Sequence, residues 1–166
     1  MNKTEILKRL ENIYTFDELY NQGVRVGDIV AYDSLVFDCG LAWDYVLLRE
    51  GFPQEFNTAL CCYKDPRTPE KMYINQIGFH WCGSLSYFHF RKITEAERKE
   101  FIDTCIKALY KPITDEYGWQ LPHYAQILDS LVRYKLISKD KLYKINKDLK
   151  DIHNVNLLKE YKSYFM

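Results

Sequence analysis

The feature of this sequence that most constrains its fold is the tetrapeptide Thr94-Glu-Ala-Glu97. A threonine hydroxyl can accept a hydrogen bond from the amide three residues later, and a carboxylate there can reach back to the threonine amide, so the pattern is typical of a helix start. The apolar residues that follow recur at spacings of three and four, as on one face of a helix. They are Phe101, Ile102, Cys105, Ile106 and Leu109. We therefore expect a helix that begins at Thr94 and that Pro112 ends.

The residues before this helix start predict an antiparallel sheet. Valine, isoleucine and aromatic residues gather there in short runs bounded by glycine, proline and polar residues, as strands do. We expect three strands, at residues 56–63, 72–81 and 84–91, and a fourth at 24–32 with a bend at Gly27. The dipeptide Cys82-Gly83 would join two of them into a hairpin. Residues 41–49 fit a short buried helix or a strand, because their period does not decide between the two.

Helices are predicted at both ends of the chain. Apolar residues from Ile6 to Tyr14 recur every three or four positions, and a short second turn follows at 16–20. The last third predicts three more helices, at 122–134, at 138–149 with Ser138 as N-cap, and at 155–164. The expected class is α+β, a small curled antiparallel sheet of three to four strands with an N-terminal helix and a C-terminal helical subdomain.

The length of 166 residues predicts a single domain. Within it we expect N-terminal helices over residues 1–22, the sheet region over 24–92 and the helical region over 94–166. The five cysteines are odd in number and show no CxxC spacing, so a disulfide framework is not expected. No segment has the apolar run of a signal peptide or a membrane span. We therefore expect a cytoplasmic protein without membrane contact.

Charge is balanced over the whole chain but not along it. Basic and acidic residues each number 23, yet residues 133–166 hold nine basic and four acidic ones, which leaves 14 and 19 for residues 1–132. A basic region of this kind fits contact with nucleic acid or an acidic protein, and equally a solvated helix face. Helical spacing places its lysines opposite Leu142, Ile145 and Leu149. The candidate contact residues are Lys139, Lys141, Lys144 and Lys147.

Aromatic residues are concentrated in the predicted hairpin. Alternation along a strand would place Tyr87, His89 and Arg91 on one face and Phe88 and Phe90 on the other. One face would pack under helices, and the other would form a patch for a protein partner or a platform for bases. A sheet covered on both faces is an equal alternative. The candidate partner-binding residues here are Trp81, Tyr87, His89 and Arg91.

A thiol or metal site is the alternative that the cysteines and histidines raise. Cys61, Cys62 and His80 lie on predicted strands, and Cys82 lies in the turn that would join two of them. If these strands pair, a thiol nucleophile with a histidine base, or a zinc ion, can be drawn there. The sequence carries none of the common catalytic or cofactor motifs, such as a P-loop or H-E-x-x-H. We therefore expect no metal, no cofactor and no catalytic residues.

The run Tyr87-Phe-His-Phe-Arg-Lys-Ile-Thr-Glu-Ala-Glu-Arg-Lys-Glu-Phe101 resembles a pattern in small uncharacterised proteins of phages and mobile elements of Bacteroides-type bacteria. There an aromatic strand enters a helix through a similar start, with alanine where this chain has Ile93. The resemblance covers about residues 72–103. It implies a phage or mobile-element origin, and a protein that binds and blocks a host factor such as a defence nuclease.

These patterns together favour a non-enzymatic macromolecule-binding protein, an inhibitor of a host factor in the manner of anti-CRISPR proteins. Its partner would be a host protein or ribonucleoprotein. The alternatives are a Cys/His-dependent hydrolase or metal-binding enzyme, and a nucleic-acid-binding accessory protein that uses the basic C-terminal helices.

Overall fold

The computed structural model of the chain describes residues 15–36, 40–54, 56–64, 72–77, 80–81, 90–110 and 121–160. The expected helix over residues 6–14 lies outside these ranges. The chain forms two compact units, Met1–Phe101 and Ile102–Met166, and each is described by itself. That the chain is a single domain stays a prediction.

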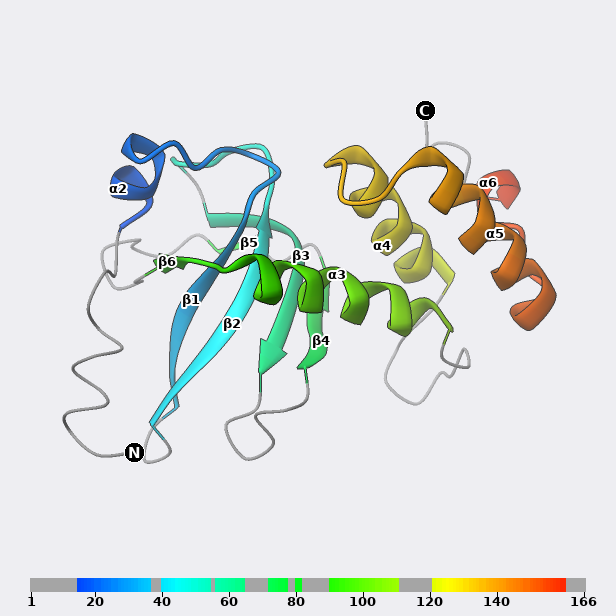
Figure 1. The fold of residues 1–166 in the computed structure, drawn as a ribbon, viewed down its shortest axis with the longest axis horizontal. Coiled ribbons are helices and arrows are strands. Elements are labelled where there is room, and N and C mark those ends of the chain that lie inside the picture. The colour runs from blue at the N-terminus through cyan, green and yellow to red at the C-terminus, as the bar shows by residue number, and fades with distance from the viewer. Residues whose placement is uncertain are drawn as a thin grey trace. The chain divides into compact units, whose positions relative to one another are not determined.

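The described elements confirm the α+β class (Figure 1). An antiparallel sheet is preceded by a helix and followed by helices, as the capping box and the strand patterns predicted. In chain order the elements are α2 (Phe16–Asn21), β1 (Ile29–Val36), β2 (Gly40–Leu48), β3 (Phe56–Lys64), β4 (Met72–Ile77), β5 (His80–Trp81), β6 (Phe90–Lys92), α3 (Glu95–Tyr110), α4 (Leu121–Arg133), α5 (Lys139–His153) and α6 (Leu157–Glu160).

The sheet has the order β4-β3-β2-β1-β6, and β5 also pairs with β3. Its four longer strands form a meander in which each strand runs antiparallel to the one before it. The pairing of β1 with β2 runs from Ile29 opposite Leu47 to Val36 opposite Gly40. The four longer strands agree with the three to four expected, but one of them, β2, lies in the segment that was left open, and β5 and β6 are short pieces that overlap the strands expected at 72–81 and 84–91.

Of the segment 41–49, which the sequence left open between helix and strand, residues 41–48 belong to β2. Tyr45, Val46, Leu47 and Leu48 are all buried, so this part of the strand has no exposed face. A strand that is covered on both faces carries a continuous apolar run instead of an alternating pattern. Because this part of β2 is buried on both faces, its sequence period could not distinguish a strand from a helix.

The expected strand at 24–32 is shifted along the chain, because β1 begins at Ile29 and continues to Val36. Gly27 lies before it with a φ of 93°, a left-handed conformation that glycine adopts without a Cβ clash. The Gly27 amide donates to the Leu48 carbonyl at 2.9 Å, and the Leu48 amide donates to the Asp28 carbonyl at 3.0 Å. The bend at Gly27 is therefore a turn outside the strand.

The expected hairpin between residues 72–81 and 84–91 is not what the described residues show. His80–Trp81 pairs with β3, whereas Phe90–Lys92 pairs with β1, on the other side of the sheet order. Strand patterns indicate which residues are extended, but not which neighbour they pair with. Residues 82–89 lie outside the described ranges.

Aromatic rings hold α2 against the sheet. The Phe16 ring stacks on Phe90 with centroids 4.2 Å apart and meets the Phe52 ring edge-on at 5.0 Å. Leu19, one turn further along, is fully buried in the same cluster. The helix begins with a capping box in which the Thr15 hydroxyl accepts from the Glu18 amide. Each buried ring or leucine contributes about 1.5–3 kcal/mol, so these contacts outweigh the poor intrinsic stability of a six-residue helix.

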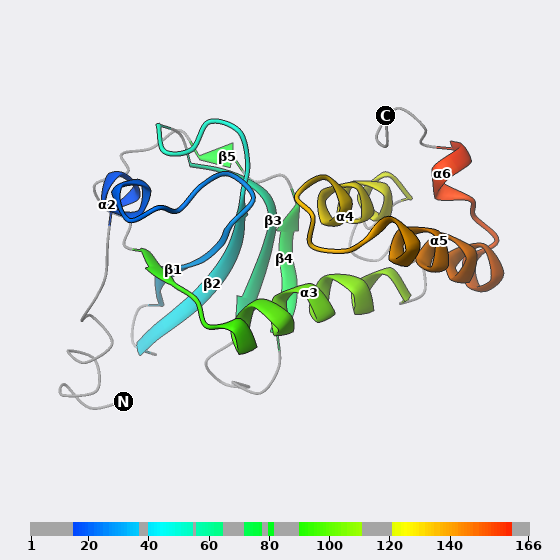
Figure 2. The same cartoon turned by 45° about the horizontal axis from the view of Figure 1, so that its top comes forward.

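The helical unit confirms the predicted elements of the last third with small shifts in their ends. α4 covers Leu121–Arg133 and α5 covers Lys139–His153, with Ser138 as the predicted N-cap. Figure 2 shows α4 and α5 side by side. Of the helix expected at 155–164, the described part is α6. Among the residues that the structure describes, no helix is long and apolar enough to cross a membrane.

Candidate macromolecule-binding surface

The sequence of α5 separates an apolar face from a lysine-rich one. Leu142, Ile145 and Leu149 recur at spacings of three and four, and all three are buried. That face packs within the unit and fixes the opposite face toward solvent. The lysines of that exposed side are Lys139, Lys141, Lys144, Lys147 and Lys150. By helical geometry Lys144 and Lys147 lie opposite the buried face, whereas Lys139 and Lys141 lie at its edges. That the predicted lysines contact a partner stays a prediction.

The five lysine side chains have no internal partner in the described part of the chain. None of their ammonium groups makes an ion pair or a hydrogen bond with another described residue. Asp148, a carboxylate of the same helix, accepts a hydrogen bond from the Tyr110 hydroxyl at 2.6 Å. Burial and this bond raise the pKa of Tyr110 to about 12. The lysine face therefore keeps its charge available for a partner.

A tyrosine lies among these lysines. Tyr143 is 61% exposed, and Lys139 and Lys147 lie four residues before and after it. Residues four apart on a helix are neighbours on its surface, and Lys150, seven residues after Tyr143, returns to the same side two turns later. We call Lys139, Tyr143, Lys147 and Lys150 the lysine–tyrosine strip.

Local hydrogen bonds fix both ends of α5. The Ser138 hydroxyl accepts from the Lys141 amide at 3.1 Å, and Asn154 ends the helix in the left-handed conformation. Asn146 donates to the Asn156 side chain at 3.2 Å and accepts from the Leu158 amide at 3.2 Å, which joins α5 to α6. The lysine–tyrosine strip is thus carried by a helix whose backbone is held in place.

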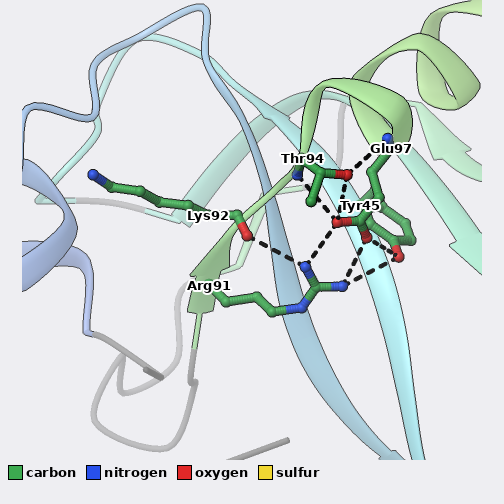
Figure 3. A network of polar contacts seen from close by, with 5 residues as sticks. All are labelled: Tyr45, Arg91, Lys92, Thr94 and Glu97. Atoms are coloured by element: carbon green, nitrogen blue, oxygen red, sulfur yellow. Dashed lines mark hydrogen bonds and ion pairs between the residues drawn. The ribbon is translucent and has the colours of Figure 1, made fainter. Parts of the chain in front are cut away.

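Arg91, the predicted contact residue nearest to the capping box, is engaged inside the protein (Figure 3). Its guanidinium donates to both Glu97 oxygens, from Nη1 at 3.0 Å and from Nη2 at 2.8 Å. The Tyr45 hydroxyl of β2 donates to the same carboxylate at 2.7 Å. Arg91 also approaches the Tyr45 hydroxyl at 3.4 Å. The network joins β2, β6 and the start of α3.

Glu97 is also the acceptor of the predicted capping box, which the structure confirms. The Glu97 amide donates to the Thr94 hydroxyl at 3.2 Å, and the Thr94 amide donates to Glu97 Oε1 at 3.1 Å. Burial is the largest single effect on this carboxyl and would raise its pKa. The hydrogen bonds from Arg91, Tyr45 and Thr94 together outweigh burial and lower the pKa to about 2. Burial, followed by the bond to Glu97, raises the pKa of Tyr45.

The chemistry of this network is structural. The Arg91 and Glu97 side chains are 24% and 19% exposed and share two hydrogen bonds, and Arg91 also donates to the Lys92 carbonyl and the Tyr45 hydroxyl. Bidentate pairs of this kind hold elements together and leave little of the guanidinium for a partner. That Arg91 contacts a partner stays a prediction.

The other predicted hairpin residues are placed only in part. Trp81 lies in β5 opposite Phe56, but its side chain is outside the described set, as are Tyr87 and His89. Phe90 is fully buried while Arg91 is partly exposed, so these two neighbours follow the expected alternation. Arg91 belongs to the unit Met1–Phe101 and the lysines belong to Ile102–Met166.

The thiol or metal hypothesis finds two of its residues in the core. Cys61 and Cys62 are buried, at 1% and 0% exposure, on β3. Within the described ranges, no three His, Cys, Asp or Glu side chains cluster closely enough to hold a metal ion. The His80 side chain and the whole of Cys82 are outside the described set, so a site that includes them stays a prediction.

Two features of these sites were missed from the sequence. Tyr143 was not singled out, although its spacing of four from Lys139 and Lys147 was available as a signal. Lys150 was counted among the charges but not among the contact residues. The pairing of Tyr45 with Glu97 left no sequence signal, because the two residues are 52 positions apart and meet only through the sheet. Comparison with family models, with curated proteins and with solved structures gave no match to this chain.

Proposed function

We propose that this chain is a macromolecule-binding protein that docks on an acidic partner through the exposed face of α5. The observation that carries the proposal is the set of five exposed lysines on α5 whose ammonium groups make no ion pair or hydrogen bond with another residue in the described part of the chain. Lysines that are exposed and close together create a positive potential, which attracts a partner of opposite charge and raises its rate of association.

The extent of the row indicates the size of the partner. From Lys139 to Lys150 the helix rises by about 16 Å, at 1.5 Å per residue. Several ammonium groups over that length match an extended polyanion, such as an acidic protein surface or a nucleic-acid backbone, better than a small anion. This supports binding of a macromolecule over turnover of a metabolite.

The resemblance to phage and mobile-element proteins supports a more specific form of this function. Proteins of that kind that bind and block a host factor act by occupying its surface, which requires contact residues and no catalytic group. A defence nuclease or another ribonucleoprotein would offer an acidic surface in its bound nucleic acid. Inhibition of such a host factor is the role that we propose for the binding.

Charge reversal on α5 tests the proposal. The double variant Lys144→Glu/Lys147→Glu is compared with Lys99→Glu/Lys107→Glu, which changes two exposed lysines of α3 by the same total charge. Binding to immobilised heparin and to polyglutamate is measured by biolayer interferometry over a series of salt concentrations. We expect binding that weakens with salt and falls at least about tenfold in the α5 variant only. Equal losses in both variants, or no binding at low salt, would contradict the proposal.

A further inference from the structure

We propose that the lysine–tyrosine strip of α5 binds single-stranded nucleic acid without sequence preference, with Tyr143 stacked on a base and the lysines at the phosphates. The inference deepens the proposed function, on which it rests, by naming the partner of the α5 face. The inference depends on the exposed ring of Tyr143, a feature that binding through charge alone does not require.

The first step of the argument is the position of the ring. Tyr143 follows Lys139 and precedes Lys147 by four residues, so lysines lie one turn away on both sides, about 5–6 Å between Cβ atoms. Asp140 precedes Tyr143 by three residues and Asp151 follows Lys147 by four, so these two exposed carboxylates border the strip on the side of Lys144. A strand laid along the other side of the strip would still meet lysines before and after the point where a base reaches the ring.

The second step is the exposure of the ring. Tyr143 is 61% exposed, on the same helix as the buried Leu142, Ile145 and Leu149. Stacking with a base removes ring surface from water and needs no matched hydrogen bonds, because every base has a flat π-face. Lysines with an interleaved aromatic residue are the combination by which single strands are bound without regard to sequence.

The third step separates this partner from an acidic protein. Protein hot spots are built from several apolar anchors that are desolvated together. On α5 the other exposed large apolar side chain is Ile152, at 55% exposure. It is nine residues from Tyr143, which places it about half a turn round the helix. The strip therefore offers one isolated ring among charges, which suits a base better than a protein core.

The fourth step concerns the form of the nucleic acid. A base can stack on Tyr143 only if it is unpaired, so a single strand should bind better than a duplex of equal length. The strip holds no Arg, Asn or Gln, the side chains that most often read base edges. We therefore expect little difference between sequences, apart from that due to stacking strength.

The experiment uses the full chain and a fluorescein-labelled oligothymidylate of about 15 nucleotides, followed by fluorescence anisotropy at low salt. Tyr143→Ala removes the ring and Tyr143→Phe keeps it. We expect binding about fivefold or more weaker in Tyr143→Ala and within about twofold of the parent in Tyr143→Phe. Circular dichroism of each variant controls for folding, and because Tyr143 is exposed we expect unchanged spectra.

A matched pair of charge variants tests the lysines. Lys147→Glu lies in the strip, whereas Lys141→Glu changes an exposed lysine of the same helix outside it. Contact with three phosphates predicts a slope of about −2 for log affinity against log salt, and Lys147→Glu should make that slope shallower while Lys141→Glu leaves it close to the parent value.

The same titrations contain the outcomes that overturn the inference. Equal affinity of Tyr143→Ala and the parent, or tighter binding of the duplex than of the single strand, would show that the ring stacks on no base. Binding of polyglutamate or heparin that the oligothymidylate does not displace would leave the proposed function standing and assign the face to an acidic protein or polyanion. If none of these polyanions binds, both the proposed function and this inference are wrong.

Discussion

Glu97 joins three features of the sheet unit through one carboxylate: it caps α3, pairs with Arg91 and accepts from Tyr45. The substitution Glu97→Gln keeps the shape and the ability to cap but removes the charge. Arg91 would then keep a partly buried cation without its counter-ion, at a cost of about 2 kcal/mol in the free energy of unfolding. Urea denaturation followed by circular dichroism measures this loss. The control is Glu95→Gln, an exposed first-turn residue of α3, for which we expect a change below about 0.5 kcal/mol.

The free energy of unfolding should depend on pH through the titration of Glu97. The pKa of Glu97 falls from 4.5 to about 2 in the folded protein, so between these values the unfolded state binds more protons. The stabilisation is therefore complete above the unfolded pKa and is lost as pH falls toward 2. Its size is at most about 3 kcal/mol, at 1.36 kcal/mol per pKa unit. Urea titrations between pH 2 and 6 should show a smaller drop in Glu97→Gln than in the parent, and equal drops would contradict the assignment.

At the scale of elements, the turn between α4 and α5 contains Lys135, whose replacement by glycine should stabilise the protein. Lys135 has a φ of 59°, and the Leu136 amide donates to the Leu131 carbonyl at 2.8 Å, the pattern of a helix that ends in a left-handed residue. A side chain in that conformation costs about 1 kcal/mol relative to glycine. We therefore expect Lys135→Gly to raise the free energy of unfolding by about 0.5–1 kcal/mol, measured by urea denaturation.

The matched control for that variant is Lys139→Gly, at the first residue of α5, where the backbone is helical. Glycine there gains nothing from the left-handed region and costs up to about 1 kcal/mol through its greater freedom when unfolded. Opposite signs for the two variants would support the assignment. A loss of stability in Lys135→Gly would show that its backbone conformation carries no strain.

The elements that could be predicted from the sequence are those that local chemistry determines. The capping box of α3, the Ser138 cap and the face of Leu142, Ile145 and Leu149 each depend on residues within a few positions of one another. The strand β2 and the pairing of β6 with β1 could not be predicted, because they depend on burial and on neighbours distant in the chain. The lysines of the candidate site followed from helical period, whereas the engagement of Arg91 required the fold.

At the scale of the whole molecule, the net charge is zero, but basic and acidic residues are unevenly distributed along the chain. Residues 133–166 hold nine basic and four acidic residues, and residues 1–132 hold 14 basic and 19 acidic ones. A chain with opposite charge in two regions and no net charge has little repulsion between copies. We expect weak association of the basic region of one copy with the acidic region of another near the isoelectric point of about 6.9.

Light scattering at low ionic strength and pH 7 measures this association, which should disappear on addition of about 0.3 M salt because the Debye length then falls below 10 Å. The variant Lys144→Glu/Lys147→Glu should associate less than the parent, since it weakens the basic region. Association that grows with salt would instead indicate apolar contact between copies. An oligonucleotide that binds α5 should also disperse the associated form, because it would occupy the cations through which the copies meet.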